Sequence, residues 1–214
     1  MPAISKEPNE WVDGFLFVGN RPILDFLNTR PVLMQGPAEF LKDFDALARW
    51  FIASGIVNSA KTQRRLRSWR DLPEAAAFLR ELLAFRERLR DAVLRIEGGF
   101  APSDEFVKEV NTRLLDHPPQ TSLRKRDGRI VRQMLFDPRK PVDLWAPIID
   151  GVADLLAEAD PGRLRQCESC VVHFYDTSKK GSRRWCSMNI CGNKIKVAAY
   201  QRRKREGDSH TART

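Results

Sequence analysis

Cys167-Glu-Ser-Cys170 and Cys186-Ser-Met-Asn-Ile-Cys191 contain every cysteine of this chain of 214 residues, and fifteen residues separate the two pairs. Two cysteines that are two residues apart direct their thiolates at one ion from a tight turn. This pair and the Cys-x4-Cys pair together supply the four sulfur ligands that Zn²⁺ prefers in a tetrahedral site. Because protein thiolates would fill all four positions, we expect one structural Zn²⁺ ion and no open position for a substrate.

Other uses of four cysteines fit this sequence less well. A redox Cys-x2-Cys motif is expected near a βαβ pattern, which the sequence lacks, and disulfides require an oxidising compartment. Iron–sulfur ligation by four cysteines is an alternative, but the spacing resembles neither common ferredoxin pattern. His173 lies between the two pairs, and we expect it to be a strand residue that points away from the metal.

The residues between and after the cysteines predict a treble-clef finger. Val171 to Tyr175 reads as a strand, residues 178–181 as a turn, and Arg183 to Trp185 as a returning strand. The second cysteine pair then opens a helix from about Asn189 to Arg205. A segment of about fifty residues buries too little apolar surface to fold alone, so metal binding should supply much of its folding free energy.

The charge of the chain is concentrated in this last quarter. Residues 1–162 contain 24 Lys and Arg and 24 Asp and Glu, whereas residues 163–214 contain 13 and 4, so the whole net charge of +9 lies beside the cysteines. Such asymmetry indicates a surface for a polyanion on one part of a two-part protein. The alternative is a solvated basic helix end that complements the helix dipole.

The preceding region has the pattern of a mostly helical domain with a small β-sheet, so the predicted fold class is α+β. Phe15 to Val18 reads as a short buried strand, while Ile23 to Leu27 fits a strand or a short helix equally well. Hydrophobic periodicity and capping residues then predict further helices. These span about 38–54, 59–69, 73–97, 103–115 and 142–159. Residues 122–136 read as a β-hairpin around Asp127-Gly128.

Asp160-Pro161-Gly162 is a cluster of residues that break helices, and we place the domain boundary there. The predicted parts are an N-terminal domain over 1–160, a zinc finger over 161–206 and a disordered tail over 207–214. The sequence shows neither a secretory signal nor a stretch of apolar residues long enough to span a membrane. We therefore expect a cytoplasmic protein.

Motifs for catalysis are not apparent in the first 160 residues. They contain no nucleotide-binding loop, no Gly-x-Ser-x-Gly, no His-Glu-x-x-His and no cysteine. We therefore expect a protein that is not an enzyme. Asp25, Asn28 and Arg30 follow the first strand and are candidates for a polar pocket that binds a small-molecule effector, although a capping or turn role fits Asp25 and Asn28 as well.

Two groups of residues resemble known families. Phe174-Tyr-Asp176-x-Ser178, Arg183-Arg-Trp-Cys-Ser-Met188 and Cys191-Gly-Asn-Lys194-x-Lys196, together with Cys-x2-Cys, resemble the CGNR-type zinc finger of bacteria. Gly19-Asn20 and Leu24-Asp-Phe-Leu-Asn-Thr29 resemble the opening of the ABATE domain, which accompanies that finger. The resemblance implies a stress-response transcription regulator whose finger binds DNA and whose N-terminal domain senses a ligand. Lys194 replaces the family's arginine, which keeps the charge but loses a bidentate fork.

The expected function is therefore a zinc-dependent DNA-binding regulator. A helix in the major groove would present residues to bases and phosphates. The candidate contacts are Arg183, Arg184, Asn193, Lys194, Lys196, Tyr200, Arg203 and Lys204. The alternatives are an adaptor that binds RNA or protein with the same finger, and an enzyme with an unrecognised site in the first domain. A lone finger reads few base pairs, so specific DNA binding favours a homodimer or a second contact surface.

Overall fold

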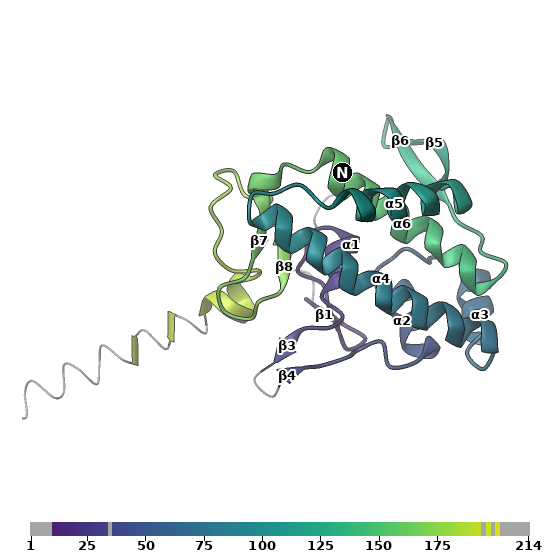
Figure 1. Ribbon diagram of the computed structural model, residues 1–214, viewed down its shortest axis with the longest axis horizontal. Coiled ribbons are helices and arrows are strands. Elements are labelled where there is room, and N and C mark those ends of the chain that lie inside the picture. The colour runs from purple at the N-terminus through teal and green to yellow at the C-terminus, as the bar shows by residue number, and fades with distance from the viewer. Residues whose placement is uncertain (1–9, 34–35, 194–195, 198–199, 202–214) are drawn as a thin grey trace, which may run out of the picture.

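The computed structural model describes residues 10–33, 36–193, 196–197 and 200–201, and it has an α+β fold (Figure 1). Within these residues, the strands pair into two-stranded antiparallel sheets. They are β1 (Trp11–Val12) with β2 (Phe15–Leu16), β3 (Val32–Leu33) with β4 (Gly36–Pro37), β5 (Gln120–Arg126) with β6 (Arg129–Leu135), and β7 (Leu164–Gln166) with β8 (His173–Tyr175).

The remaining helices are arranged around a long central helix, α4 (Pro73–Glu97) (Figure 1). These are α1 (Pro22–Leu27), α2 (Phe44–Ala53), α3 (Ala60–Ser68), α5 (Asp104–Asp116) and α6 (Trp145–Glu158). Twenty-five residues of α-helix span about 37 Å. The helix therefore reaches from α3 at one end of the molecule to β7 and the finger at the other (Figure 1).

Ile23 to Leu27, which fitted a strand or a short helix equally well, form part of helix α1. Pro22 occupies the first turn, where its missing amide hydrogen costs nothing. The Asp25 carboxylate accepts a hydrogen bond from the Gly19 amide at 2.7 Å. A Cβ at Gly19 would lie 2.9 Å from that same carboxylate oxygen, so the turn has no room for a side chain there.

The core of the N-terminal domain is rich in aromatic residues. The Trp145 ring lies against Phe78 and Phe85, at 5.7 and 5.1 Å between centroids and in edge-to-face geometry. Trp50 makes a similar contact with Phe26 at 5.5 Å. Burying a large apolar side chain contributes about 1.5–3 kcal/mol, and these rings join α1, α2, α4 and α6 in one cluster.

Helix α2 is shorter than the predicted 38–54. It begins at Phe44 because the Asp43 side chain accepts a hydrogen bond from the Ala46 amide at 2.8 Å and caps the helix. Upstream, Glu39 is held out of any helix by Arg86, which is 1% exposed and forms two bonds to the Glu39 carboxylate. Thr29 accepts a further hydrogen bond from Arg86.

The other N-terminal elements agree with the sequence analysis to within a few residues. The hairpin of β5 and β6 turns at Asp127-Gly128, both with positive φ, as a type I′ turn requires. Ser103 caps α5 by accepting the Phe106 amide. The predicted helix over 142–159 begins as a 3₁₀ turn, Pro141–Leu144, before α6 takes over.

The finger differs from the predicted hairpin. Strand β8 pairs with β7, which precedes the first cysteine, and residues 183–185 form no strand. The Asp176 side chain explains this, because it is fully buried and accepts the amides of Ser178 at 2.8 Å and Arg183 at 2.7 Å. These bonds close residues 176–183 into a loop and occupy the Arg183 amide that a returning strand would use.

Candidate metal centre and its surroundings

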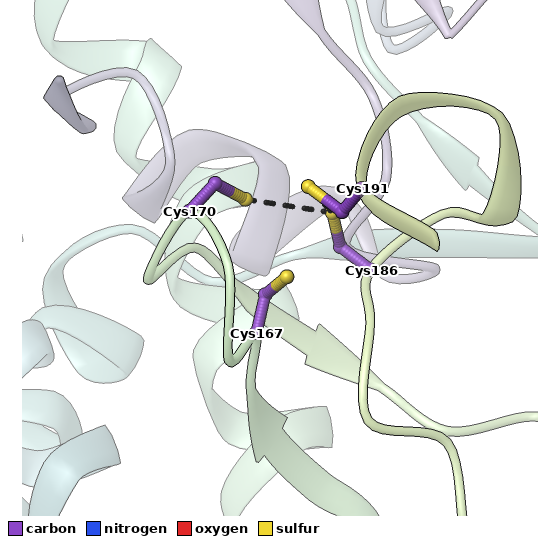
Figure 2. Close-up of side chains that lie close together, drawn as sticks. All are labelled: Cys167, Cys170, Cys186 and Cys191. Carbon is purple, nitrogen blue, oxygen red and sulfur yellow. Dashed lines mark hydrogen bonds between the residues drawn. The ribbon is translucent and has the colours of Figure 1, made fainter. Parts of the chain in front are cut away.

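The four cysteine sulfurs converge on one point (Figure 2). All lie within 4.8 Å of one another, and the cysteines are not disulfide-bonded. The Cys170 and Cys186 sulfurs are 3.6 Å apart, and those of Cys186 and Cys191 are 3.8 Å apart. Four sulfurs placed tetrahedrally about 2.3 Å from one Zn²⁺ ion would be separated by about 3.8 Å. The donor set and its spacing therefore fit a structural zinc ion.

The first cysteine pair lies in the turn that joins β7 to β8. The Cys167 amide donates to the Val172 carbonyl at 2.9 Å, and the Cys167 carbonyl accepts the Val171 amide at 3.0 Å. Val171 has φ of 53°, in the left-handed region that a β-branched residue rarely adopts. This strained residue lies directly after Cys170. The turn that contains it directs the thiols of Cys167 and Cys170 towards the same point (Figure 2).

The second pair is held by a cap and a tight helical turn. The Ser187 hydroxyl accepts the amides of Asn189 and Ile190, and the π-helical turn Met188–Gly192 carries Cys191 back towards Cys186. A Cβ on Gly192 would lie 2.6 Å from the Met188 sulfur. A side chain after Cys191 would therefore require the half-exposed Met188 side chain to move.

Electrostatics also favour a cation between these sulfurs. Contacts with Cys170 and Cys186 lower the pKa of Cys167, while the contact with Cys167 raises the pKa of Cys170 to about 12. The same contact with Cys167 raises the pKa of Cys186. Four thiolates this close repel one another, and a divalent ion removes that conflict by neutralising part of their charge.

The small core around the cysteines is completed by the N-terminal segment of the chain. Cys167, Cys186, Cys191, Val172 and Phe174 are buried together with Val18, and Leu16 packs against them. Trp185 also packs on this cluster, as expected for a core residue of the finger. The finger therefore shares its apolar core with residues more than 140 positions earlier in the sequence.

Hydrogen bonds also join the residues around α1 to strand β8 of the finger. The Asn28 side chain donates to the His173 carbonyl at 2.8 Å and accepts the His173 amide at 2.9 Å. The Tyr175 amide donates to the Gly19 carbonyl at 2.8 Å. The His173 ring, 1% exposed, bonds through Nδ1 to Glu97 at the end of α4, at 2.9 Å. His173 thus points away from the cysteines, as its place in a strand predicted.

Comparison with known protein families agrees with this geometry. The profile of the CGNR zinc finger matches residues 163–204. The profile of ABATE, described as "Putative stress-induced transcription regulator", matches residues 20–159, well over half of the chain. The chain belongs to the ABATE family. No curated protein matches it.

As an ABATE protein with a CGNR finger, the chain binds one structural zinc ion, and the clustered thiols of Cys167, Cys170, Cys186 and Cys191 are the group that could hold it. Its family indicates a zinc-binding transcription regulator. Among the described residues, no helix is both long enough and apolar enough to cross a membrane. The division into domains at residue 160 stays a prediction, and the structure shows both parts packed against each other.

The predicted nucleic-acid contacts have different surroundings in the structure. Arg183 is turned inward, donating to the Cys186 carbonyl with its guanidinium 5.2 Å from the centre of the Phe174 ring. Arg184 is exposed but paired with Glu168. Asn193, Lys196 and Tyr200 are exposed on the helix that follows Cys191. Lys194, Arg203, Lys204 and the predicted tail 207–214 lie outside the described residues.

Asp25, Asn28 and Arg30 have partners within the protein. The Asp25 carboxylate accepts the Gly19 amide, and the Asn28 side chain donates to the His173 carbonyl in β8. Arg30 forms an ion pair with Glu87 at 2.9 Å. None of the three lines either of the two described cavities. The structure thus matches the alternative turn role for Asp25, and ligand binding by this trio stays a prediction.

Sequence reasoning missed three residues that shape the site, namely Asp176, Glu97 and Val18. The Asp-x-Ser pattern of residues 176–178 was a local signal, because a short acidic side chain commonly accepts the amide two residues ahead. The burial of Val18 was predicted, but neither its contact with the finger nor the bond of Glu97 to His173 gave a local signal, since both partners are distant in sequence.

Replacing Asn28 with alanine should destabilise the protein by about 3 kcal/mol. The change leaves the buried amide and carbonyl of His173 without partners, and each unsatisfied group costs about 1–3 kcal/mol. Urea unfolding of the zinc-loaded chain measures this. Asn58→Ala is the matched control, because its side chain bonds the Gly55 carbonyl at an exposed site. Equal losses for the two variants would contradict the role of Asn28.

Proposed function

We propose that this protein is a zinc-dependent, DNA-binding transcription regulator in which the finger contacts DNA and the N-terminal domain receives a small ligand. The main support is that Asn193, Lys196 and Tyr200 are exposed and helical shortly after Cys191, the fourth cysteine of the cluster. The metal fixes the start of this helix, so its side chains are presented in a defined direction.

Charge supports DNA as the partner. The whole net charge of +9 lies in residues 163–214, and phosphate contacts by such residues supply most of the affinity and the salt dependence of DNA binding. Arg184 contributes less than the sequence suggests, because its ion pair with Glu168 must break before it can bind phosphate. Of the predicted cationic contacts that lie within the described residues, Lys196 is therefore the strongest candidate.

The adaptor alternative has one observation in its favour. Met188, Val197 and Tyr200 are exposed apolar or aromatic side chains, at 44%, 54% and 62%. Exposed side chains of this kind suit a protein surface or the bases of a folded RNA as well as a DNA groove. Comparing duplex DNA with structured RNA at equal salt, and both with binding to protein, separates these partners.

Selection from a random pool of duplex DNA with the zinc-loaded full chain tests the proposal. We expect enrichment of sequences that the Cys186→Ser chain does not enrich, because that variant lacks one zinc ligand. No enrichment over Cys186→Ser would contradict DNA recognition and favour the adaptor.

Lys196→Gln should weaken binding to a selected duplex about three- to tenfold at 100 mM salt and lower the salt slope by about one, because one phosphate contact is lost. Lys61→Gln is the control, since it removes the same charge from exposed α3 at the opposite end of α4 (Figure 1). The two variants can be compared by fluorescence anisotropy across a salt series. An equal effect of both would show that only net charge matters.

A further inference from the structure

The largest described cavity lies in the N-terminal domain, away from the zinc site. It has a volume of about 780 Å³, is open to solvent on one side, and is lined by the start of α1, the connection between α2 and α3, strand β6 and helix α6. This volume is within the range of small-molecule sites, about 300–1,000 Å³.

Apolar side chains form most of the cavity wall. They include Ile23, Ile56, Met134, Phe136, Pro147 and Ile148. Trp50 also lines it, and within the described part of the chain its buried indole N–H has no hydrogen-bond partner. This lining suits a ligand with an aliphatic or aromatic body.

Carboxylates form the polar side. Asp150, Asp154 and Glu158 follow one another at intervals of four residues on α6, so they share one helix face, and all three line the cavity. Burial raises the pKa of Asp150; Arg132 lowers it, and the negative charge of Asp154 raises it again. A cation placed between these groups would be stabilised by more than one carboxylate.

The two arginines of the cavity differ in how firmly they are held. Arg21 pairs with Asp154, and its guanidinium lies 4.5 Å from the centre of the Tyr175 ring. Arg132 is 66% exposed in its side chain and approaches Asp150 only to 3.6 Å. Arg132 is therefore the cation that a ligand can displace at little cost.

We propose that this cavity is an effector site for a small organic cation that carries an apolar body. Its ammonium group takes the place of Arg132 beside Asp150, and its hydrocarbon part lies against Ile23, Phe136 and Ile148. An anion of the same shape binds less well, because it meets three carboxylates and only two guanidinium groups, one of which is committed to Asp154.

The cavity also has a direct connection to the finger. Arg21 lies on its rim and covers Tyr175 of β8, and the neighbouring Asn20 side chain donates to the Tyr175 carbonyl at 2.8 Å. An ammonium group beside Asp150 also attracts Asp154, one turn further along α6, and so competes with Arg21 for that carboxylate and changes the contact of Arg21 with Tyr175 of β8. This coupling rests on the proposed function of the finger, whereas the binding site itself does not.

Three probes with one skeleton test the site, namely 6-phenylhexylammonium, 6-phenylhexanoate and 6-phenylhexanol. We expect the ammonium to bind the zinc-loaded full chain at least fivefold more tightly than the carboxylate, by calorimetry, and to shift the Trp50 indole resonance. Asp150→Asn should weaken ammonium binding about fivefold, the effect of one partly exposed ion pair. Arg132→Gln should leave it unchanged or strengthen it.

Glu105→Gln is the matched control, since it removes the same charge from an exposed position on α5 that is not in the cavity wall. No ammonium binding, equal binding of ammonium and carboxylate, equal effects of Asp150→Asn and Glu105→Gln, or weaker binding by Arg132→Gln would overturn the proposal. These measurements contain no DNA, so their failure leaves DNA binding by the finger intact. If the probe binds as expected and DNA affinity does not change, the site stands and the coupling fails.

Discussion

A Cys186→Ser chain is expected to lose its compact finger and, with it, specific DNA binding. Removing one of four thiolates leaves Zn²⁺ with an incomplete site, and structural zinc supplies on the order of 10 kcal/mol to small domains of this kind. Chelation of the native chain should have the same effect. Limited proteolysis should cut residues 163–201 rapidly, while α4 and its aromatic neighbours stay protected, because their core does not include the cysteines.

Ser169→Ala provides the control for this experiment. Ser169 is exposed between the two ligands of the first pair, so its loss should leave zinc content and protease resistance unchanged. The segment around Leu16 and Val18 should loosen together with the finger, since it shares that small core. Unchanged cleavage of the finger after verified metal removal would contradict the structural role of the metal.

Asp25→Asn is expected to change how stability depends on pH. Burial raises the pKa of Asp25 from 3.8 to about 7, although the amides of Gly19 and Val18 act in the opposite direction. Between these two values the folded state binds more protons than the unfolded state, so this carboxyl makes the native protein less stable as pH rises from about 4 to about 7. The total effect is about 4 kcal/mol, at about 1.4 kcal/mol per pH unit.

The variant lacks this titration, while an asparagine oxygen can still accept the Gly19 amide. Relative to the native protein, Asp25→Asn should therefore gain free energy of unfolding as pH rises, with the difference reaching a plateau above pH 7. Urea unfolding of both zinc-saturated proteins from pH 4.5 to 8 measures the difference. Asp71→Asn, at an exposed carboxylate, should track the native protein, and a flat difference for Asp25→Asn would show that this carboxyl is not perturbed.

Features that depend on local chemistry were predictable from the sequence. Helix α4 begins at Pro73 and ends before Gly98 as expected, and Asp127-Gly128 forms the predicted hairpin turn. The four cysteines converge because their spacing already restricts the geometry. In each case the signal lies within a few residues of the feature that it specifies.

Features that depend on distant partners were not predictable in this way. Strand β8 pairs with β7 because Asp176 takes the Arg183 amide and because Asn28, 145 residues away, binds the His173 backbone. Glu39 lies outside α2, whose start is set by the local cap Asp43, and is held there by its ion pair with Arg86 of α4. Periodicity cannot reveal such competition, because each outcome depends on a side chain from another element.

One zinc ion, bound by four thiolates, is expected to hold the C-terminal part of this ABATE protein in its folded form. Elemental analysis combined with zinc X-ray absorption on freshly purified full-length protein tests it most directly. We predict one zinc per chain and a first shell of four sulfurs at about 2.3 Å. A chain that is folded and protease-resistant over residues 163–201 without stoichiometric metal, or a zinc shell that contains nitrogen or oxygen, would contradict it.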